Sequence, residues 1–442
     1  MRLFIVGLTL GILALSQPAV IVAQEYEQAP ILSAKEMLPK KLLKTDYYSI
    51  DERVVNDGYL NIYQIRSSYG DDTAVGRAVL DIKLNELRAL HDLNDYSSSK
   101  VVYEAAKKNG KQALLAPVHV AEALVDVVTN PMKVVDTAKS IPDGVLSMFS
   151  WASKQVGKGI DAAQSYMSSD SSSEGSGQQS SKEGLASKGV GAATNAGLNY
   201  IHYNSAEREL LQKLSIDQFS DNVLLQKEVQ RVAGIETAVS IAFKFVPGFN
   251  LGLIGSAARW YKRAEELGLY KEPEEIVDMN RKRLLELGVE KEAANKFINN
   301  GAMRPSLQAL ILDNLLKLKG VHNRQGFVIL ATQAKKLEVA LFFASASEML
   351  SELHQETPFE RLVVSLHLPG AITAAGHVVV PLPVDYLPWT KDISGIFHDY
   401  KKVVASEHKV KSGEVVTTGR SSPMAKRELG KLGVVVVEYK KR

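Results

Sequence analysis

The stretch VVTTGRSSPMAKRELGKLGVVVVEY, residues 415–439, has the pattern of a strand, a glycine–serine turn, a helix and a second strand. Two parallel strands joined by a helix form a right-handed crossover, and ligands bind near the turn after the first strand in such folds. The stretch therefore predicts a small α/β element in the last part of the chain. It also raises the question of whether its turn binds an anion or only begins a helix.

Four residues of this turn are candidate anion-binding residues: Gly419, Arg420, Ser421 and Ser422. Gly419 permits an unusual backbone angle, either serine can cap the helix, and Pro423 suits its first turn. The free amides there, together with Arg420, could hold a carboxylate or a phosphate. All these features are also found at helix N-termini that bind no ligand. The turn has neither a Walker lysine nor a G-x-G-x-x-G motif. The plain helix start is the simpler interpretation.

A second candidate site lies in VVVPLPVDYLPWT, residues 378–390. Asp385 ends an apolar run, which is a position from which many α/β proteins project a carboxylate into a site. Tyr386 and Trp389 beside it could line a pocket. In the simpler alternative, Asp385 caps a turn between two prolines, and Tyr386 and Trp389 pack in the core. No G-x-S-x-G motif is present, so the sequence predicts no catalytic residue.

The histidines are a third candidate, because five of the nine fall in one window near the end of the chain. None of them shows the H-x-x-x-H spacing or the H-E-x-x-H motif of a zinc site. We therefore predict exposed or singly hydrogen-bonded histidines, no metal site and no cofactor. The five are His354, His367, His377, His398 and His408.

The rest of the chain is predicted to be mostly helical. Residues 47–66 alternate apolar and polar side chains around Asn56-Asp57-Gly58, which indicates a β-hairpin. Residues 73–95 have the period of an amphipathic helix, and further helices are indicated over 98–165 and from 203 to 356. The predicted fold class is therefore mainly α (α+β), with helical domains, an N-terminal β-hairpin and a small C-terminal α/β element.

The first residues predict export. A short start with Arg2, an apolar run from Leu3 to Leu15 and a small-residue end at Ala23 follow the order of a secretory signal peptide. An uncleaved N-terminal anchor is the alternative. The chain has no cysteine, which excludes disulfides and thiolate chemistry and fits a bacterial periplasm. A formal net charge of +3 does not indicate a nucleic-acid-binding protein.

The composition changes along the chain predict five regions. Residues 168–197 are rich in serine and glycine and are expected to form a flexible linker. The regions are a signal peptide (1–23), a hairpin with a helical region (24–167), the linker (168–197), a helical domain (198–357) and a small α/β element (358–442).

Several segments together resemble a family of uncharacterised exported proteins from Gram-negative bacteria. They are VVNDGYLNIYQI (54–65), TNPMKVVDTAKSIPDGVLSMF (129–149), LSIDQFSDNVLLQKEVQRVA (214–233), VPLPVDYLPWT (380–390) and TTGRSSPMAKRELGKLG (417–433). The resemblance implies an exported, cell-envelope location. It implies no activity and no catalytic residues, because the family has none established.

Two functions remain open at the level of sequence. The first is a non-catalytic envelope protein that binds an unknown protein partner or the membrane face, through the helices of 98–165 or the apolar stretch 238–258. The second is an enzyme or small-anion-binding protein with its site where the loops of Asp385 and Gly419–Ser422 meet. An exposed apolar helix face would favour the first, and a concave pocket joining the two loops would favour the second. The sequence predicts no oligomeric state.

Overall fold

The N-terminal part of the chain forms a five-stranded antiparallel sheet. The computed structural model describes residues 25–98, 200–239, 256–365, 368–408, 410 and 412–439. In this first sheet the strand order is β1-β3-β4-β2, and β5 also pairs with β4. The elements are β1 (Ile31–Ser33), α1 (Ala34–Met37), α2 (Lys40–Leu43), β2 (Tyr48–Ile50), β3 (Arg53–Asn56), β4 (Asn61–Ser67) and β5 (Asp72–Val75).

The predicted hairpin is part of this sheet. Strands β3 and β4 pair with Val55 opposite Ile62, and Gly58 in the turn has a φ of +109°. The Asn56 side-chain oxygen accepts a hydrogen bond from the Gly58 N–H at 2.8 Å, which is a local contact that favours a turn. The hairpin prediction is therefore matched only in part, because β4 also pairs with β2 and β5.

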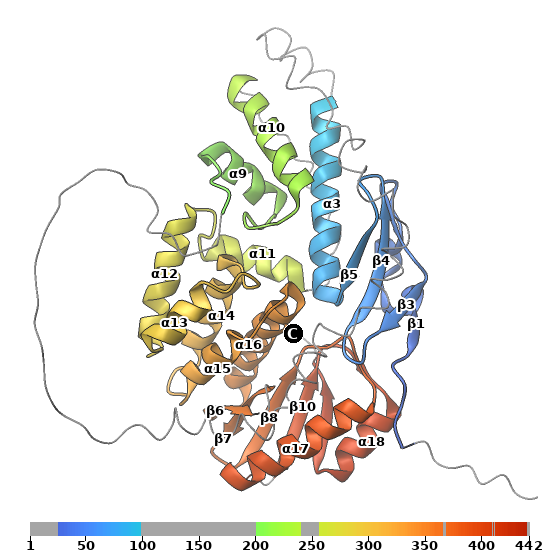
Figure 1. Cartoon of the computed structure of the whole chain (residues 1–442), viewed down its shortest axis with the longest axis vertical. Coiled ribbons are helices and arrows are strands. Elements are labelled where there is room, and N and C mark those ends of the chain that lie inside the picture. The colour runs from blue at the N-terminus through green and yellow to red at the C-terminus, as the bar shows by residue number, and fades with distance from the viewer. Residues whose placement is uncertain are drawn as a thin grey trace, which may run out of the picture.

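One long helix stands beside the first sheet, and the helices of the middle of the chain lie on the other side of that helix (Figure 1). The long helix α3 corresponds to the amphipathic helix predicted over residues 73–95 and stands next to the sheet. The helices are α3 (Arg77–Ser98), α9 (Ser205–Leu214), α10 (Val223–Val239), α11 (Ser256–Glu266), α12 (Pro273–Glu286), α13 (Lys291–Ile298), α14 (Pro305–Lys317), α15 (Arg324–Ala331) and α16 (Leu337–Glu356).

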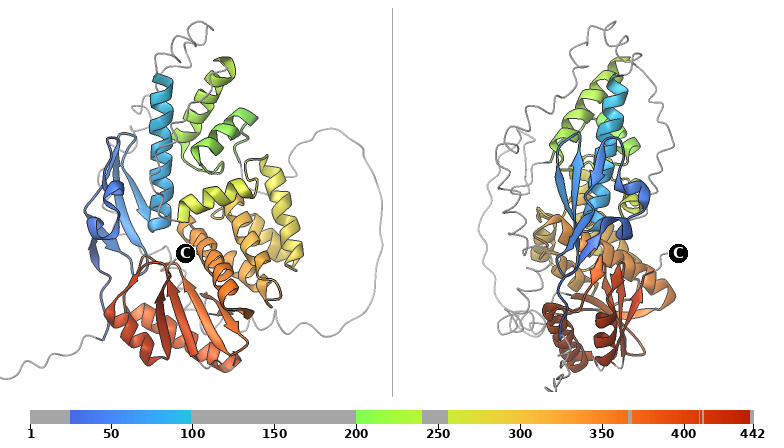
Figure 2. Two further views of the ribbon diagram at one scale, coloured as in Figure 1. Left: turned by 180° about the vertical axis from the view of Figure 1, so that it is seen from behind. Right: turned by 90° about the vertical axis from the view of Figure 1, so that its right-hand side faces the viewer.

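The C-terminal part forms a second five-stranded sheet with the order β12-β10-β8-β7-β6. Strands β8, β10 and β12 are parallel, whereas β6, β7 and β8 pair antiparallel. Helices α17 and α18 connect the parallel strands and cover one face of the sheet (Figures 1 and 2). The elements are β6 (Phe359–Ser365), β7 (Leu368–Thr373), β8 (His377–Leu382), β9 (Tyr386–Leu387), α17 (Lys391–His408), β10 (Ser412–Thr417), β11 (Arg420–Ser421), α18 (Pro423–Lys431) and β12 (Val434–Glu438).

The fold class is mixed α/β, so the prediction of a mainly α fold is wrong. The structure is about 51% helical and 21% strand, and its described residues include two five-stranded sheets. The strand content that was not predicted comes in part from β1 and β5, which have three and four residues. Strands this short show too few alternations to be recognised by their period, and they are stabilised by neighbours that are not adjacent in sequence.

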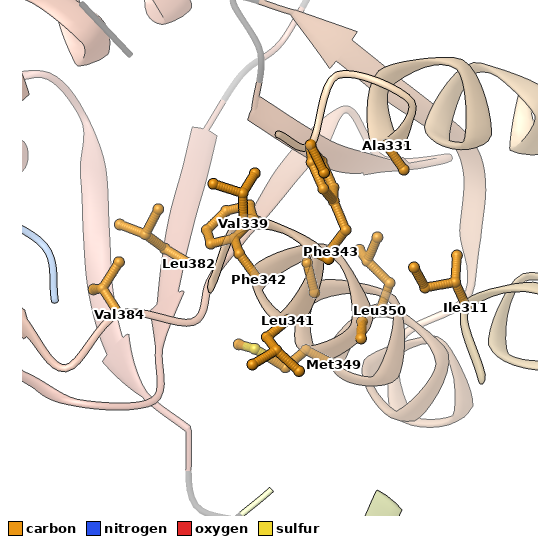
Figure 3. Close-up of a cluster of buried hydrophobic side chains, with 14 of the residues drawn as sticks. Ile311, Ala331, Val339, Leu341, Phe342, Phe343, Met349, Leu350, Leu382 and Val384 are labelled. Carbon is orange, nitrogen blue, oxygen red and sulfur yellow. The ribbon is translucent and has the colours of Figure 1, made fainter. Parts of the chain in front are cut away.

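One large hydrophobic core joins the two sheets to the helices between them. It contains Tyr63 from β4, Phe343 from α16 and Leu382 from β8, each almost fully buried. Figure 3 shows that apolar side chains lie on both sides of α16, with Leu382 and Val384 on one side and Ile311 on the other. Helix α16 is apolar around most of its circumference, as expected of a helix that is buried on all sides.

Several predicted segments lie outside the described residues. They are the signal peptide (1–23), the linker (168–197), nearly all of the helical region 98–165 and most of the apolar stretch 238–258. Among the described residues, every helix falls short of the length or the apolar character that a membrane crossing requires.

Candidate functional site

A cavity of about 490 Å³ lies where the first sheet, α16 and the C-terminal sheet meet. One wall is formed by the residues that follow the parallel strands: 383–385 after β8, 418–420 after β10, and 438–439 at the end of β12. The cavity therefore lies at the carboxyl ends of three parallel strands, which is where α/β folds place their ligands. Its volume is that of a small-molecule site.

Asp385 joins the C-terminal sheet to the first sheet and to α3. Its carboxylate accepts a hydrogen bond from the backbone N–H of Asn61 at 2.9 Å and from that of Arg77 at 3.0 and 3.2 Å. Arg77 is the first residue of α3, and Gly76 before it has a φ of +88°. The Asp385 carboxylate thus lies at the N-terminus of a 22-residue helix, where negative charge is favoured.

The environment of Asp385 makes its carboxyl group a proton donor or acceptor near neutral pH. Burial raises its pKa to about 6, although the hydrogen bonds from Asn61 and Arg77 and the charge of the Arg77 guanidinium oppose this shift. The side chain is surrounded by protein and yet keeps accessible surface, because it faces the cavity. A carboxyl group in this state can bind a ligand or exchange a proton with it.

A chain of hydrogen bonds continues from Asp385 into the first sheet. The Asn56 side-chain amide donates to the Asn61 side-chain oxygen at 2.9 Å, and the Asn61 amide donates to the Tyr63 hydroxyl at 3.1 Å. On the other side, Arg77 Nε donates to Asp81 Oδ1 at 2.6 Å. Burial raises the pKa of Tyr63, so its hydroxyl remains protonated at neutral pH. Asn61, Tyr63 and Arg77 all line the cavity.

Gly419 brings the two predicted loops into direct contact. A Cβ added to Gly419 would lie 1.9 Å from the Asp385 carbonyl oxygen, which no side chain could tolerate. The next residues form a short parallel pair, in which Tyr386 of β9 lies opposite Arg420 of β11. Thr418 also donates from its hydroxyl to the Val384 carbonyl oxygen at 3.1 Å. The structure therefore brings Asp385, Gly419 and Arg420 together at one cavity.

Arg420 supplies a cation that no carboxylate of the described residues pairs with. Its side chain is exposed at the cavity and has no hydrogen-bond or ion-pair partner among the described residues. Carboxylates also line the cavity, among them Glu338 in the first turn of α16 and Glu36 in α1. The cavity therefore presents charges of both signs to a ligand.

A carboxylate of the chain itself contacts the residue that caps α18. The Ser422 hydroxyl oxygen accepts from the Ala425 N–H at 2.9 Å, which is the geometry of a helix cap. The same hydroxyl donates to Glu27 Oε2, and this oxygen also accepts from the Trp389 N–H at 2.6 Å. The turn after β10 thus begins a capped helix, and the Glu27 carboxylate lies beside this cap.

The other predicted site residues do not line the cavity. Ser421 lies in β11, and its buried hydroxyl has no hydrogen-bond partner among the residues that the structure describes. Trp389 is 3% exposed and belongs to the core. Tyr386 is half-buried and lines a separate surface hollow with Glu27.

The described histidines are dispersed rather than gathered at one site. His354 Nδ1 accepts from the Phe359 N–H at 2.9 Å, and His398 Nδ1 lies 2.7 Å from the Ser394 carbonyl oxygen. His377 contacts Ser412. His367 and the side chain of His408 lie outside the described part of the chain.

Within the described ranges, one group of side chains has the composition of a metal site: His202, Glu272 and Glu274. His202 and Glu274 are exposed, and Glu272 already forms an ion pair with Arg208 at 2.8 Å. This ion pair competes with any metal ion for the Glu272 carboxylate. The group therefore gives little support for a metal centre.

Sequence patterns did not identify Asn61, Tyr63 or Arg77 as cavity residues. Asn61 and Arg77 are 324 and 308 residues away from Asp385, so no local spacing relates them to it. Asn61 lies in a strand after an Asp-Gly turn, and Arg77 lies at the beginning of a helix. These patterns indicated secondary structure and gave no sign of a binding site. Comparison with protein-family models, with curated proteins and with solved structures gave no match to this chain.

Proposed function

We infer that the protein binds a small molecule with both an anionic and a cationic group, such as an amino acid or a short peptide, in the cavity next to Asp385. The observation that carries this inference is the cavity itself, which joins the Asp385 and Gly419–Arg420 loops at the carboxyl ends of parallel strands. A concave site at these loops is what the second of the two sequence-based hypotheses required.

The charges on the cavity walls support this class of ligand. The Arg420 guanidinium is suited to a carboxylate or phosphate, with which it can form paired hydrogen bonds. Glu338 and Glu36 line the cavity as well and are suited to an ammonium group or to hydrogen-bond donors. Leu60, Val75 and Phe342 provide the apolar surface that small-molecule sites need for affinity.

The test is a thermal-unfolding screen with free amino acids, and with simple carboxylates and simple amines as partial ligands. A ligand at 100 times its dissociation constant stabilises the folded state by about 2.7 kcal/mol, which gives a measurable rise in Tm. Arg420→Gln should abolish the rise for ligands with a carboxylate. Arg53→Gln, which removes an exposed arginine that does not line the cavity, should leave it unchanged. Equal responses in both variants would refute the role of the cavity.

The proposed location is outside the cytoplasm, in the periplasm or at the membrane face. It is supported by Arg2, the apolar run Leu3–Leu15 and the small residues that end at Ala23. Mass spectrometry of the protein from fractionated cells tests it, with an expected mature start near Gln24. An intact Met1 in a cytoplasmic fraction would contradict export. The alternative of partner binding through residues 98–165 or 238–258 rests on segments outside the described residues and stays a prediction.

A further inference from the structure

The hydrogen bonds of the first sheet determine which way the hydroxyl group of Tyr63 can donate its proton. A backbone N–H can only donate, so the Asn56 side-chain oxygen is the atom that accepts from the Gly58 N–H. The Asn56 amide therefore donates to the Asn61 side-chain oxygen, at 2.9 Å. This leaves the Asn61 amide as the donor to the Tyr63 hydroxyl oxygen, at 3.1 Å. The Tyr63 oxygen is thus an acceptor in this chain of hydrogen bonds, and its own proton is directed elsewhere.

The Tyr63 proton has no acceptor among the residues that the structure describes. Tyr63 is 1% exposed and lines the cavity next to Asp385. A buried hydroxyl proton without an acceptor costs free energy comparable to that of a lost hydrogen bond. Burial, and after it the nearby Asp385 charge, raise the pKa of Tyr63, so the proton stays on the oxygen at neutral pH. Tyr63 is therefore a donor whose proton a ligand in the cavity can accept.

The Asp385 carboxylate provides an acceptor close to this donor. Asn61 connects the two, because its backbone N–H donates to Asp385 at 2.9 Å while its side chain contacts Tyr63. The carboxylate accepts from the backbone N–H groups of Asn61 and Arg77, whereas a carboxylate has room for about four hydrogen bonds. Asp385 also lines the cavity. The cavity therefore offers a neutral donor and an acceptor that lie close together.

The size of the cavity and the positions of its charges indicate what this donor and acceptor bind. The volume of about 490 Å³ holds roughly sixteen water molecules at about 30 Å³ each, which is close to the heavy-atom number of a small tripeptide. Arg420, Glu36 and Glu338 line the cavity from other elements, namely β11, α1 and α16. If these residues bind the charged ends of a ligand, Tyr63 and Asp385 are left for a polar group between the ends. A peptide bond is such a group.

We propose that the ligand is a peptide of two or three residues, and that Tyr63 donates a hydrogen bond to one of its backbone carbonyl oxygens. This inference rests on the function proposed above and narrows its ligand class. Arg420 binds the C-terminal carboxylate, and Glu338 or Glu36 binds the amino group. Asp385 accepts from a backbone N–H of the peptide. A free amino acid whose carboxylate is bound to Arg420 leaves the Tyr63 proton without an acceptor, so it binds more weakly.

The test compares peptides with free amino acids on the purified full-length protein. A thermal-unfolding screen uses each amino acid X, the dipeptides X-Ala and Ala-X, and the tripeptide Ala-X-Ala at equal concentrations. Peptides should raise the Tm more than free amino acids do. Calorimetric titration then measures the Kd of the best peptide. Tyr63→Phe removes only the hydroxyl group and should weaken the binding of this peptide by about tenfold, as expected for the loss of one buried hydrogen bond. The binding of free amino acids should stay nearly unchanged.

A second measurement needs no variant of Tyr63. A trans-alkene isostere of the best peptide lacks the carbonyl oxygen and the N–H of its peptide bond. The wild type should bind this isostere at least about tenfold more weakly than the peptide. Amidation of the peptide C-terminus should weaken binding to the wild type and should have little effect on Arg420→Gln.

Tyr48→Phe is the matched control. It removes another buried tyrosine hydroxyl of the first sheet, in β2, and Tyr48 does not line the cavity. Its affinity for the peptide should equal that of the wild type. Unchanged peptide affinity in a folded Tyr63→Phe protein, or an isostere that binds as well as the peptide, would overturn the hydrogen bond. Equal responses to peptides and free amino acids would overturn the peptide ligand and leave the proposed function standing. No response to either class would refute the proposed function itself.

Discussion

At the scale of single residues, Asp385 connects three segments that lie more than 300 positions before it. Its backbone N–H donates to the Tyr59 carbonyl oxygen at 3.0 Å, and its carboxylate accepts from Asn61 and Arg77. One side chain thus connects the end of β8, the turn before β4 and the start of α3. The cost of this arrangement is a carboxyl group whose ionised form is poorly solvated, and the pH dependence of stability should reveal it.

We predict that Asp385 makes the protein less stable as the pH rises from 4 to 7. The pKa of the unfolded aspartate is about 3.9, whereas the folded value is about 6, so the folded state binds the proton more tightly. The stabilisation of the folded state that results from this tighter proton binding is fully present below about pH 4 and is lost as the pH passes 6. Its size is roughly 3 kcal/mol, from about two pKa units at 1.36 kcal/mol each.

Urea unfolding of the wild type and of Asp385→Asn at several pH values measures this contribution. The free energy of unfolding of the wild type minus that of Asp385→Asn should fall as the pH rises from 4 to 7. Asp278→Asn, at an exposed position of α12, serves as the matched control and should follow the wild type. If the free energies of unfolding of the wild type and Asp385→Asn changed with pH in parallel, burial would not shift the pKa of Asp385.

A second prediction at this scale concerns Gly419. Gly419→Ala places a Cβ within 1.9 Å of the Asp385 carbonyl oxygen, so the backbone of one loop must move. We expect a loss of more than about 2 kcal/mol in the free energy of unfolding, typical of severe overpacking. Gly430→Ala in α18 is the control, because its Cβ would meet no atom within 4 Å. This control should be neutral or slightly stabilising, and similar losses in both variants would exclude the close contact.

At the scale of elements, the segment before β1 completes the start of α18. Glu27 accepts from the Trp389 N–H and the Ser422 hydroxyl, and its own N–H donates to the Trp389 carbonyl oxygen at 2.8 Å. The cap of a C-terminal helix therefore depends on a residue near the other end of the chain. Hydrogen bonds to a carboxylate contribute more than neutral ones, so this contact should matter for stability.

We predict that Glu27→Ala lowers the free energy of unfolding by about 2 kcal/mol, because it leaves the Trp389 N–H without its carboxylate acceptor. Added acetate should raise the Tm of this variant more than that of the wild type, since a free carboxylate can occupy the vacated position. Glu25→Ala, which removes a nearby exposed carboxylate, is the control and should show neither effect. A Glu27→Ala protein as stable as the wild type would argue against the contact.

Local sequence patterns correctly predicted the helices, strands and turns that are encoded by their own residues and do not depend on distant pairing. The pattern of residues 415–439 predicted β10, α18 and β12, and the Asn56-Asp57-Gly58 turn predicted the β3–β4 connection. They also led to the hypothesis that the loops of Asp385 and Gly419–Ser422 meet, and of these residues Asp385, Gly419 and Arg420 line the cavity. They could not supply Asn61, Tyr63 or Glu27, whose roles arise from pairing between distant segments. The short strands β1 and β5 were missed for the same reason.

At the scale of the whole molecule, the N-terminal part and the C-terminal part share one core. The large cluster contains Leu80 of α3, Leu341 of α16 and Val415 of β10. Polar contacts also join the two parts, since the Asp385 carboxylate accepts from the Asn61 N–H, and Arg88 of α3 donates to the Leu214 carbonyl oxygen in the middle of the chain. Residues 25–98 are therefore packed against chain segments that begin more than a hundred positions later.

We predict that cutting the chain within residues 168–197 leaves its two pieces associated. The serine- and glycine-rich composition of this segment favours cleavage there by a protease. The contacts of Asp385 with Asn61 and Arg77, and the shared core, should hold the pieces together under native conditions. Size-exclusion chromatography after limited proteolysis should give one peak, and denaturing electrophoresis two bands. Separation of the pieces in native buffer would show that the parts fold independently.

The hydrogen bond between Asp385 and the Arg77 N–H links positions 308 residues apart. A ribosome must therefore complete most of the chain before α3 acquires the carboxylate at its first turn. Contacts of such high sequence separation slow folding, because a long loop has to close before they form. A chain that is exported through a membrane would gain from this delay, since it would stay unfolded, and so able to pass through a translocation channel, until synthesis is nearly finished.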